Sequence, residues 1–350
     1  MSRSPEYATA QQRRRPSAET QQSPSKSRQQ QTPAPAAGSG SSSGWFRIPA
    51  PLARLFNRFP LLTYPPNELP TRSPRTRDLP TLYVFISDQD ALKGLPSFNP
   101  SCLKWQTFLR LAGVEFRTVP SNNHASPTGA LPFLIPPTPP PGGGGGGPSD
   151  SKSPPQQTPA VVPSSKLEQW ALSHGSGAAK LPDDSAPSSS SMKLEAYEAL
   201  LDHRIRAAWL YALYLSPANS ALLSHLYVAP TSASQVVRAT IRHQLRRAAE
   251  SEIVKVSGGS SLSVNPAAVY DGAREAFGAL AAVLGEDPWF FGSSGPGLFD
   301  ATVFSYTHLI LDEGLAWENR KLVEIVEGFP SLVRHRDRIL QRCWPSLSSA

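Results

Sequence analysis

The chain has 350 residues, and its 37 Pro and 24 Gly place part of that length outside any packed core. The net charge of +7 is uneven, because the first 80 residues hold 12 Lys and Arg against four Asp and Glu, while the other 270 hold 22 against 23. Since a nucleic-acid-binding fold carries its basic surface on the folded domain, this distribution argues against nucleic acid as a partner.

The cysteine content and the apolar segments indicate the cellular compartment and the relation to membranes. Cys102 and Cys343 are too few for a disulfide framework and lack nearby zinc-ligating partners, which favours a reducing compartment. The N-terminus has no apolar core of a secretory signal, and its prolines argue against a transit helix. The most apolar stretch, residues 207–229, is interrupted at residues 216–220, which predicts two packed helices joined by a turn instead of a membrane span.

The first 80 residues divide into two segments. Residues 1–44 are rich in Ser, Gln, Pro and Arg and nearly free of large apolar side chains, so we expect a disordered tail. Residues 45–80 begin with an aromatic and basic stretch and continue as a Pro-rich, extended segment. The stretch either docks on the folded body or contacts a membrane surface or a partner. Its candidate contact residues are Trp45, Phe46, Arg54, Phe56, Arg58 and Phe59.

Residues 81–173 are predicted to form an α/β domain. The apolar run at residues 82–86 is expected to be a buried strand. Asn99 and Pro100 open a helix, and residues 114–119 alternate as a second strand. Two strands joined by a helix form a βαβ unit.

A hairpin with a long insertion completes this domain. Residues 131–135 predict a third strand. Residues 136–159, which include six consecutive glycines, are a low-complexity insertion expected to be disordered. Residues 160–162 then form a short strand, and Ser164 and Ser165 are expected to cap the helix that follows.

A polar linker at residues 174–191 separates this domain from residues 192–345, which are predicted to be all-helical. Apolar side chains step by three or four residues from Leu194 to Leu215, as along one long helix. Further helical patterns cover residues 235–256, 266–284, 299–311 and 318–341. A sheet-containing half followed by a helical half is an α+β arrangement.

One of these helices carries a ladder of like charges. Arg238, Arg242 and Arg246 lie at i, i+4 and i+8, a spacing that destabilises a helix unless an acidic group faces it. The ladder is either a solvated face partly balanced by Glu250 and Glu252, or a contact for an acidic partner or anionic lipid.

The seven histidines are not spaced as metal ligands are, so no metal site is predicted.

The order of these elements resembles the glutathione transferase fold, with a thioredoxin-like first domain and an all-α second domain. Within that superfamily, the sequence resembles the metaxin family. The segments that carry the resemblance are residues 100–110 (PSCLKWQTFLR), 125–134 (ASPTGALPFL), 289–292 (WFFG) and 297–304 (GLFDATVF). The resemblance implies a cis peptide between Leu131 and Pro132. It also implies that Asp300 belongs to a capping box in which Gly297 replaces the usual Ser or Thr.

The residues give little support for catalysis. A transferase of this fold needs a nucleophile or hydroxyl donor near the start of the first helix, where the helix dipole favours a thiolate. Cys102 is the only thiol there and has no Cys-x-x-Cys partner, which indicates a small buried residue. Glutathione recognition also expects an acidic residue before the serine pair, where this chain has Pro163. No catalytic residue or cofactor is therefore expected, and the alternative is a divergent glutathione transferase or thiol oxidoreductase that uses Cys102.

The metaxin resemblance implies a role in protein import. The chain would be a peripheral subunit on the cytosolic face of the mitochondrial outer membrane, in the sorting and assembly machinery for β-barrel proteins. Its implied partners are β-barrel precursors, the barrel subunit that inserts them and a second metaxin-like subunit. A groove between the domains is the expected place for an extended peptide. The candidate structural or binding residues are Leu131, Pro132, Ser164, Ser165 and Asp300.

Overall fold

The computed structural model describes residues 78–137, 161–177, 189–256 and 264–348. The tail expected at residues 1–44, the contact stretch at residues 45–59 and nearly all of the expected insertion lie outside these residues.

A four-stranded sheet forms the centre of the first domain. Its strands are β1 (Thr81–Val84), β2 (Arg117–Pro120), β3 (Phe133–Ile135) and β4 (Val162–Pro163). The spatial order is β2-β1-β3-β4, with β1 parallel to β2 and antiparallel to β3, and with β3 antiparallel to β4. The helix α3 (Pro100–Leu111) joins β1 to β2, so the predicted βαβ unit is confirmed. The second strand begins three residues later than expected, because the Val114 N–H still donates to the Leu109 carbonyl at the end of α3.

Two further helices belong to this domain, α2 (Asp88–Lys93) and α4 (Leu167–His174). The sequence did not predict α2, which buries none of its residues. The expected capping by Ser164 and Ser165 is wrong, since both lie in the 3-10 turn Ser164–Lys166 and neither side chain caps α4. The turn takes up the positions at which we expected the α-helix to begin.

The second domain is helical. Its long first helix consists of α5 (Ser189–Leu200) and α6 (Arg206–Leu210), with π-helical turns at Leu201–Ile205 and Tyr211–Leu215. The remaining helices are α7 (Ser220–Leu223), α8 (Gln235–Val256), α9 (Pro266–Leu284), α10 (Leu298–Leu311), α11 (Lys321–Glu327), α12 (Pro330–Cys343) and α13 (Pro345–Ser348). The single helix predicted at residues 318–341 is wrong. Pro330 starts a separate helix because proline lacks the N–H and disfavours a helical residue before it.

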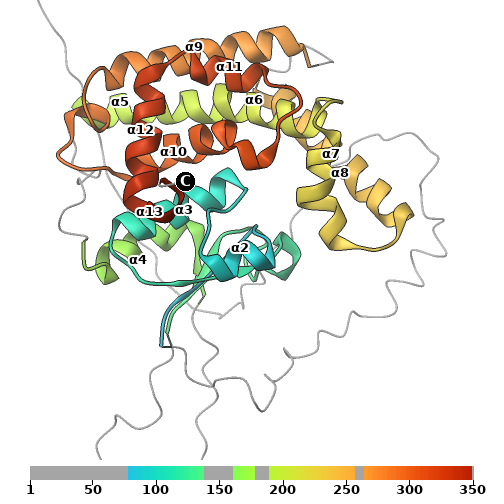
Figure 1. Cartoon of the computed structure of the whole chain (residues 1–350), viewed down its shortest axis with the longest axis horizontal. Helices are drawn as coiled ribbons and strands as arrows, with labels where there is room; N and C mark the ends of the chain where they lie inside the picture. The colour runs from blue at the N-terminus through green and yellow to red at the C-terminus, as the bar shows by residue number, and fades with distance from the viewer. Residues whose placement is uncertain (1–77, 138–160, 178–188, 257–263, 349–350) are drawn as a thin grey trace, which may run out of the picture. The chain divides into compact units, whose positions relative to one another are not determined.

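Helix α10 lies in the core and links the two domains. Eleven of its residues are buried, and it packs against α3 of the first domain and against α11 and α12. Figure 1 shows α7 and α8 on one side of the helical domain, away from α11 and α12. None of the helices within the described ranges is long and apolar enough to cross a membrane.

A buried carboxylate fixes the start of α10. Asp300 Oδ2 accepts from the Gly297 N–H at 2.9 Å, and Oδ1 accepts from the Phe290 N–H at 3.1 Å. His335 Nε2 on α12 lies 2.8 Å from Oδ1, and its imidazole is 0% exposed. Because a carboxylate only accepts hydrogen bonds, we assign the imidazole proton to Nε2. The Asp300 side chain therefore forms the carboxylate half of the implied capping box. Its hydrogen bond with His335 also attaches α12 to the start of α10.

We expect Asp300→Asn to lower the free energy of unfolding by about 2–4 kcal/mol, because an amide nitrogen would face the donors that the carboxylate now accepts. Chemical denaturation of both proteins measures the difference. Asp337→Asn is the matched control, since Asp337 is exposed and its one partner among the described residues is its neighbour Arg336. That control is expected within about 0.5 kcal/mol of the wild type. Equal effects of the two changes would contradict the role given to Asp300.

Acid is expected to destabilise the fold through His308 on α10. Burial, aided by the charge of Arg336, lowers the pKa of this imidazole to about 3. The unfolded chain binds the proton near pH 6.5, so the contribution of neutral His308 is present above that pH and is lost as the pH falls toward 3. His308→Gln should therefore show a shallower loss of Tm between about pH 7 and about pH 4. The exposed His225→Gln serves as control, and an unchanged slope in His308→Gln would contradict the assignment.

Candidate functional site

One amide side chain joins the start of α3 to the helical domain. Asn99 is the N-cap of α3, and its Oδ1 accepts from the Cys102 N–H at 3.2 Å. Its Nδ2 donates to the hydroxyl of Tyr227 at 3.0 Å. Tyr227 lies in the π-helical turn Ser224–Val228 after α7. The position at which a transferase of this fold needs its nucleophile is therefore in contact with the second domain.

The thiol at this position is closed off from solvent. Cys102 is 0% exposed, and burial raises the pKa of its thiol to about 12, although backbone hydrogen bonding at Phe85 and the Ser97 side chain act in the opposite direction. Ser97 Oγ donates to the Phe85 carbonyl at 2.5 Å. Burial thus outweighs the helix N-terminus, which by itself favours a thiolate. Near neutral pH Cys102 is a protonated, inaccessible thiol.

An aromatic cluster packs around this position. It consists of Phe85, Phe98, Tyr214 and Tyr227. The ring of Tyr227 meets Phe85 and Phe98 edge to face, each with ring centroids 5.3 Å apart. Tyr214 adds a tilted contact to Tyr227 at 5.8 Å. Side chains of the helical domain therefore occupy the space next to the start of α3.

The two tyrosines of the cluster are not bases. Burial raises the pKa of Tyr214 to about 12, and it raises the pKa of Tyr227 well above its ordinary value. Both phenols stay protonated near neutral pH and serve as hydrogen-bonding groups. Tyr227 accepts from Asn99 and shares a hydrogen bond with Tyr214. The cluster acts as packing and does not supply a general base.

The ammonium of Lys104 is not among the groups that shift the pKa of Cys102. Burial lowers the pKa of its ammonium, and the carboxylates of Glu198, Asp202 and Glu168 oppose that shift. The ammonium also lies over the ring of Trp105, 5.2 Å from its centroid. Since Glu168 belongs to the first domain and the other two carboxylates to the second, Lys104 takes part in a charge arrangement that spans both.

The peptide bond between Leu131 and Pro132 is cis, as the resemblance implied. Both residues are buried at the start of β3. The Leu131 N–H donates to Asn123 Oδ1 at 3.0 Å, within the same loop. This donor is therefore already used inside the protein and is not left open for a ligand.

The other expected site residues do not gather at Cys102. Ser164 is half-buried and Ser165 is exposed, and no hydrogen bond between described residues joins either of them to the aromatic cluster. Asp300 holds the start of α10. In the part of the chain that the structure covers, no group of three or more His, Cys, Asp or Glu is placed to hold a metal ion.

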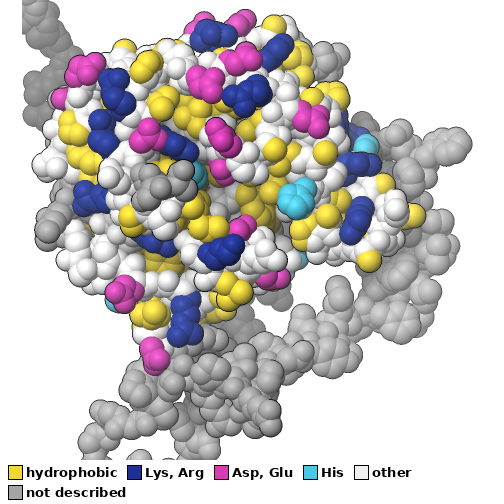
Figure 2. Space-filling view, in the orientation of Figure 1, with side chains coloured by type: hydrophobic (Ala, Val, Ile, Leu, Met, Phe, Trp, Pro, Cys, Tyr) yellow, Lys and Arg dark blue, Asp and Glu magenta, His cyan; other side chains and the backbone are white. Residues whose placement is uncertain are grey.

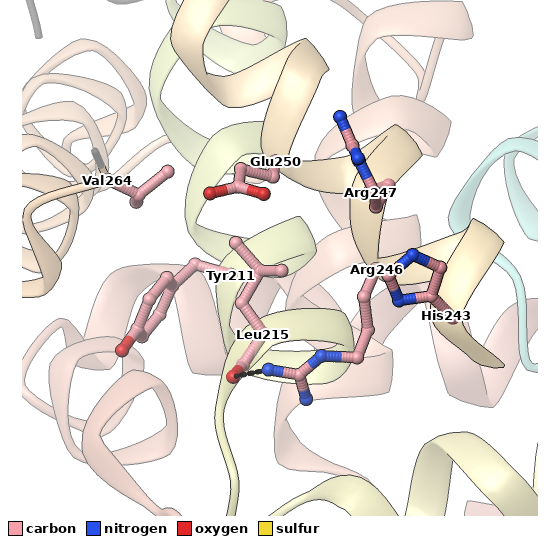
Figure 3. Close-up of a pocket in the computed structure, with 7 residues that line it drawn as sticks. All are labelled: Tyr211, Leu215, His243, Arg246, Arg247, Glu250 and Val264. Carbon is pink, nitrogen blue, oxygen red and sulfur yellow. Dashed lines mark hydrogen bonds between the residues drawn. The ribbon is translucent and has the colours of Figure 1, made fainter. Parts of the chain in front are cut away.

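The arginine ladder lies on α8, and two of its members are held by backbone. Arg238 donates from Nε to the Ser232 carbonyl at 2.5 Å and from Nη2 to the Ala229 carbonyl at 3.2 Å. Arg246 Nη2 donates to the Leu215 carbonyl at 3.1 Å, as Figure 3 shows. Only Arg242 points to solvent without a hydrogen bond or ion pair to any described residue. The ladder therefore anchors α8 as well as contributing charge.

A pocket of about 460 Å³ lies beside the C-terminal half of α8 (Figure 3). Its lining residues are Tyr211, Leu215, His243, Arg246, Arg247, Glu250 and Val264. None of them belongs to the aromatic cluster, so this pocket is separate from the Cys102 site. Glu250 offsets part of the positive charge of the two arginines.

Sequence reasoning missed the aromatic cluster. Phe85 and Phe98 lie more than a hundred residues before Tyr214 and Tyr227 in the sequence. The periodicity of apolar residues does not predict contacts between segments so far apart. Asn99 was the available signal, since an Asn before a Pro predicts a helix cap. Its second bond, to Tyr227, follows only from the tertiary structure.

Two family models match the chain. The model of the glutathione S-transferase N-terminal domain matches residues 100–219, and that of the glutathione S-transferase C-terminal domain matches residues 273–339. The fold is glutathione S-transferase-like. The predicted α+β class, a thioredoxin-like domain followed by a helical domain, is confirmed for this glutathione S-transferase-like chain. No curated protein matches its sequence.

Solved structures with similarity to this glutathione S-transferase-like chain include enzymes from fungi and a bacterium. A glutathione S-transferase of Ceriporiopsis subvermispora in complex with glutathione is 13% identical, with 76% of this chain and 98% of that chain covered and a TM-score of 0.45. A β-etherase from Sphingobium is 12% identical, with 77% and 99% covered and a TM-score of 0.44. Glutathione transferase Omega 1C from Trametes versicolor is 12% identical, with 77% and 90% covered and a TM-score of 0.41.

We expect Cys102 to react very slowly with Ellman's reagent in the folded protein. At about pH 8, a thiol with a pKa of about 12 has roughly one thiolate in 10,000 molecules, and burial adds a steric barrier. Tyr227→Ala should raise the rate at Cys102 at least about tenfold by opening the cluster, whereas Tyr227→Phe keeps the ring and should leave the rate near that of the wild type.

The adduct is assigned to Cys102 or Cys343 by peptide mass mapping, since burial also raises the pKa of Cys343 to about 12. Circular dichroism confirms that each variant is folded. Rapid labelling of Cys102 in the folded wild type would contradict the closed site.

Proposed function

We propose that this glutathione S-transferase-like chain is a non-catalytic subunit of the metaxin type. It would act as a peripheral protein on the cytosolic face of the mitochondrial outer membrane. There it would bind β-barrel precursors and its partner subunits in the sorting and assembly machinery, the barrel subunit and a second metaxin-like protein. The observation that carries the non-catalytic part is the closed Cys102 site, in which the thiol is buried and protonated and the Tyr227 ring packs next to it.

The segments that resemble metaxins lie where the fold depends on them, which supports the choice within the superfamily. Residues 100–110 form most of α3, and residues 125–134 contain the cis peptide before β3. Residues 297–304 contain Asp300 and the start of the buried helix α10. A subunit that has lost chemistry keeps such residues for its architecture, because function resides in sites and not in the fold.

The closed site also bears on where a precursor binds. The groove expected to accept an extended peptide is occupied at the start of α3 by the rings of the aromatic cluster. A precursor or partner would then engage another surface of the chain. Binding by an exposed helix face or sheet edge needs no movement of this cluster.

The second candidate function is a divergent glutathione transferase or thiol oxidoreductase that uses Cys102. The two transferase family models favour it. It requires Cys102 to become accessible and its pKa to fall, which in turn requires Tyr227 to leave the cluster. The proposed scaffold role is compatible with a buried, protonated Cys102, whereas the enzyme requires an accessible Cys102 with a lowered pKa.

The test uses the full chain with an affinity tag, expressed in cells and recovered from isolated mitochondria. We expect it to co-purify with the barrel subunit of the sorting and assembly machinery, and we expect its depletion to reduce assembly of β-barrel precursors. Cys102→Ser should restore assembly to the wild-type level. A protein recovered only from the cytosol, without assembly components, would contradict the proposal. Glutathione turnover that disappears in Cys102→Ser would favour the enzyme instead.

A further inference from the structure

The N-terminal half of α8 contains no fully buried residue. Ala249 and Ile253 are the buried residues of this helix, and both lie in its second half. At its start, Val236 is 76% exposed and Val237 is 43% exposed. Figure 1 shows this part of α8 at the edge of the helical domain. A polar, weakly packed helix that keeps two exposed valines is an unusual surface for a chain with a large buried core.

Four exposed residues of α8 form one face. Val236, Thr240, His243 and Arg247 lie at i, i+4, i+7 and i+11, so they follow each other along one side of the helix. We call these four residues the α8 stripe. The stripe is apolar at its N-terminal end and cationic at its C-terminal end, and Val237 lies beside it. It has the pattern of a surface that receives another helix.

The charge around the stripe has one sign. Residues 203–249 contain six Arg and no Asp, Glu or Lys, whereas the chain after residue 80 has slightly more acidic than basic side chains. Arg242 and Arg247 are exposed, and neither forms a hydrogen bond or ion pair with a described residue. On the face shown in Figure 2, basic side chains are visible over the region of α8.

Acidic side chains begin at Glu250, which lies next to Arg246 and Arg247 in the pocket (Figure 3). Arg246 donates to the Leu215 carbonyl, whereas Arg242 and Arg247 form no hydrogen bond or ion pair with a described residue and can face a partner. A complementary partner therefore needs carboxylates opposite the C-terminal part of the stripe. Such complementarity governs the rate and specificity of association more than its strength.

The charge and composition of the stripe argue against three other occupants. A second copy docked through the same stripe would place arginines against arginines in a parallel pair or against valines in an antiparallel pair, and it would bring no carboxylate to Arg247 in either. The chain's first 80 residues are strongly basic and would be repelled. A membrane surface is also disfavoured, because the stripe has no Trp, Phe, Tyr or Leu to enter the interface. An acidic protein segment with a few aliphatic side chains is complementary to both ends of the stripe, because its aliphatic groups can cover Val236 and its carboxylates can pair with Arg247.

We infer that the α8 stripe is a docking surface for an acidic, amphipathic helix of a partner protein. The aliphatic side chains of that helix cover Val236 and Val237, and its carboxylates meet Arg247 and Arg242. The inference goes beyond the proposed import role and does not depend on it, since it rests on the exposure and charge of α8 alone.

The probe is a synthetic helical peptide of about 18 residues with Leu and Glu on one face, and a peptide with Lys in place of Glu is its control. Fluorescence anisotropy with the full chain measures binding at about 50 mM and about 300 mM salt. We expect saturable binding of the acidic peptide that weakens with salt, and no binding of the basic one. Arg247→Glu and Val236→Glu should each raise the Kd at least about tenfold.

Arg274→Glu is the matched control, because Arg274 is exposed on α9 and the change in net charge is the same. It should change the Kd by less than about twofold. Equal loss of binding in Arg274→Glu, or no saturable binding of the acidic peptide, would overturn the inference. Phosphatidylserine vesicles are tested in parallel, and vesicle binding that Arg247→Glu abolishes, without peptide binding, would assign the stripe to a membrane instead.

Discussion

The hydrogen bonds accepted by the Asp300 carboxylate hold together the centre of this structure. They connect the segment at Phe290, the start of α10 and the imidazole of His335 on α12. A buried carboxylate is costly unless its lone pairs are satisfied, and here three donors satisfy them. Because α10 is the helix on which α3 packs, the position of the first domain depends on this arrangement.

The position of α3 in turn decides what the site can do. The start of a helix favours a thiolate, and enzymes of many folds use this to activate cysteine. In this chain, packing against Tyr227 and its neighbours removes the thiol from water, and desolvation outweighs the helix terminus. The same contact joins the two domains through Asn99. Interdomain packing and the burial of the Cys102 thiol are thus one structural feature.

The sequence predicts most clearly the elements that carry their own signals. Helices α8 and α9 have the predicted bounds, and α9 starts at Pro266 with Asn265 as its cap. Helix α2 escaped prediction because it buries no residue and therefore has no apolar stripe. The serine pair resembled a helix cap, yet the local backbone formed a 3-10 turn. The cis peptide came from family resemblance, since sequence alone favours trans.

Glutathione titration of the full chain tests the closed site most directly. Isothermal calorimetry and amide NMR spectra are recorded as glutathione rises to about 10 mM, well above the concentrations that saturate a typical enzyme site. We expect no saturable heat and no shifts at Asn99, Cys102 or Leu131. Saturable binding with shifts at these three residues would contradict the closed site, because the start of α3 would then be open to a ligand.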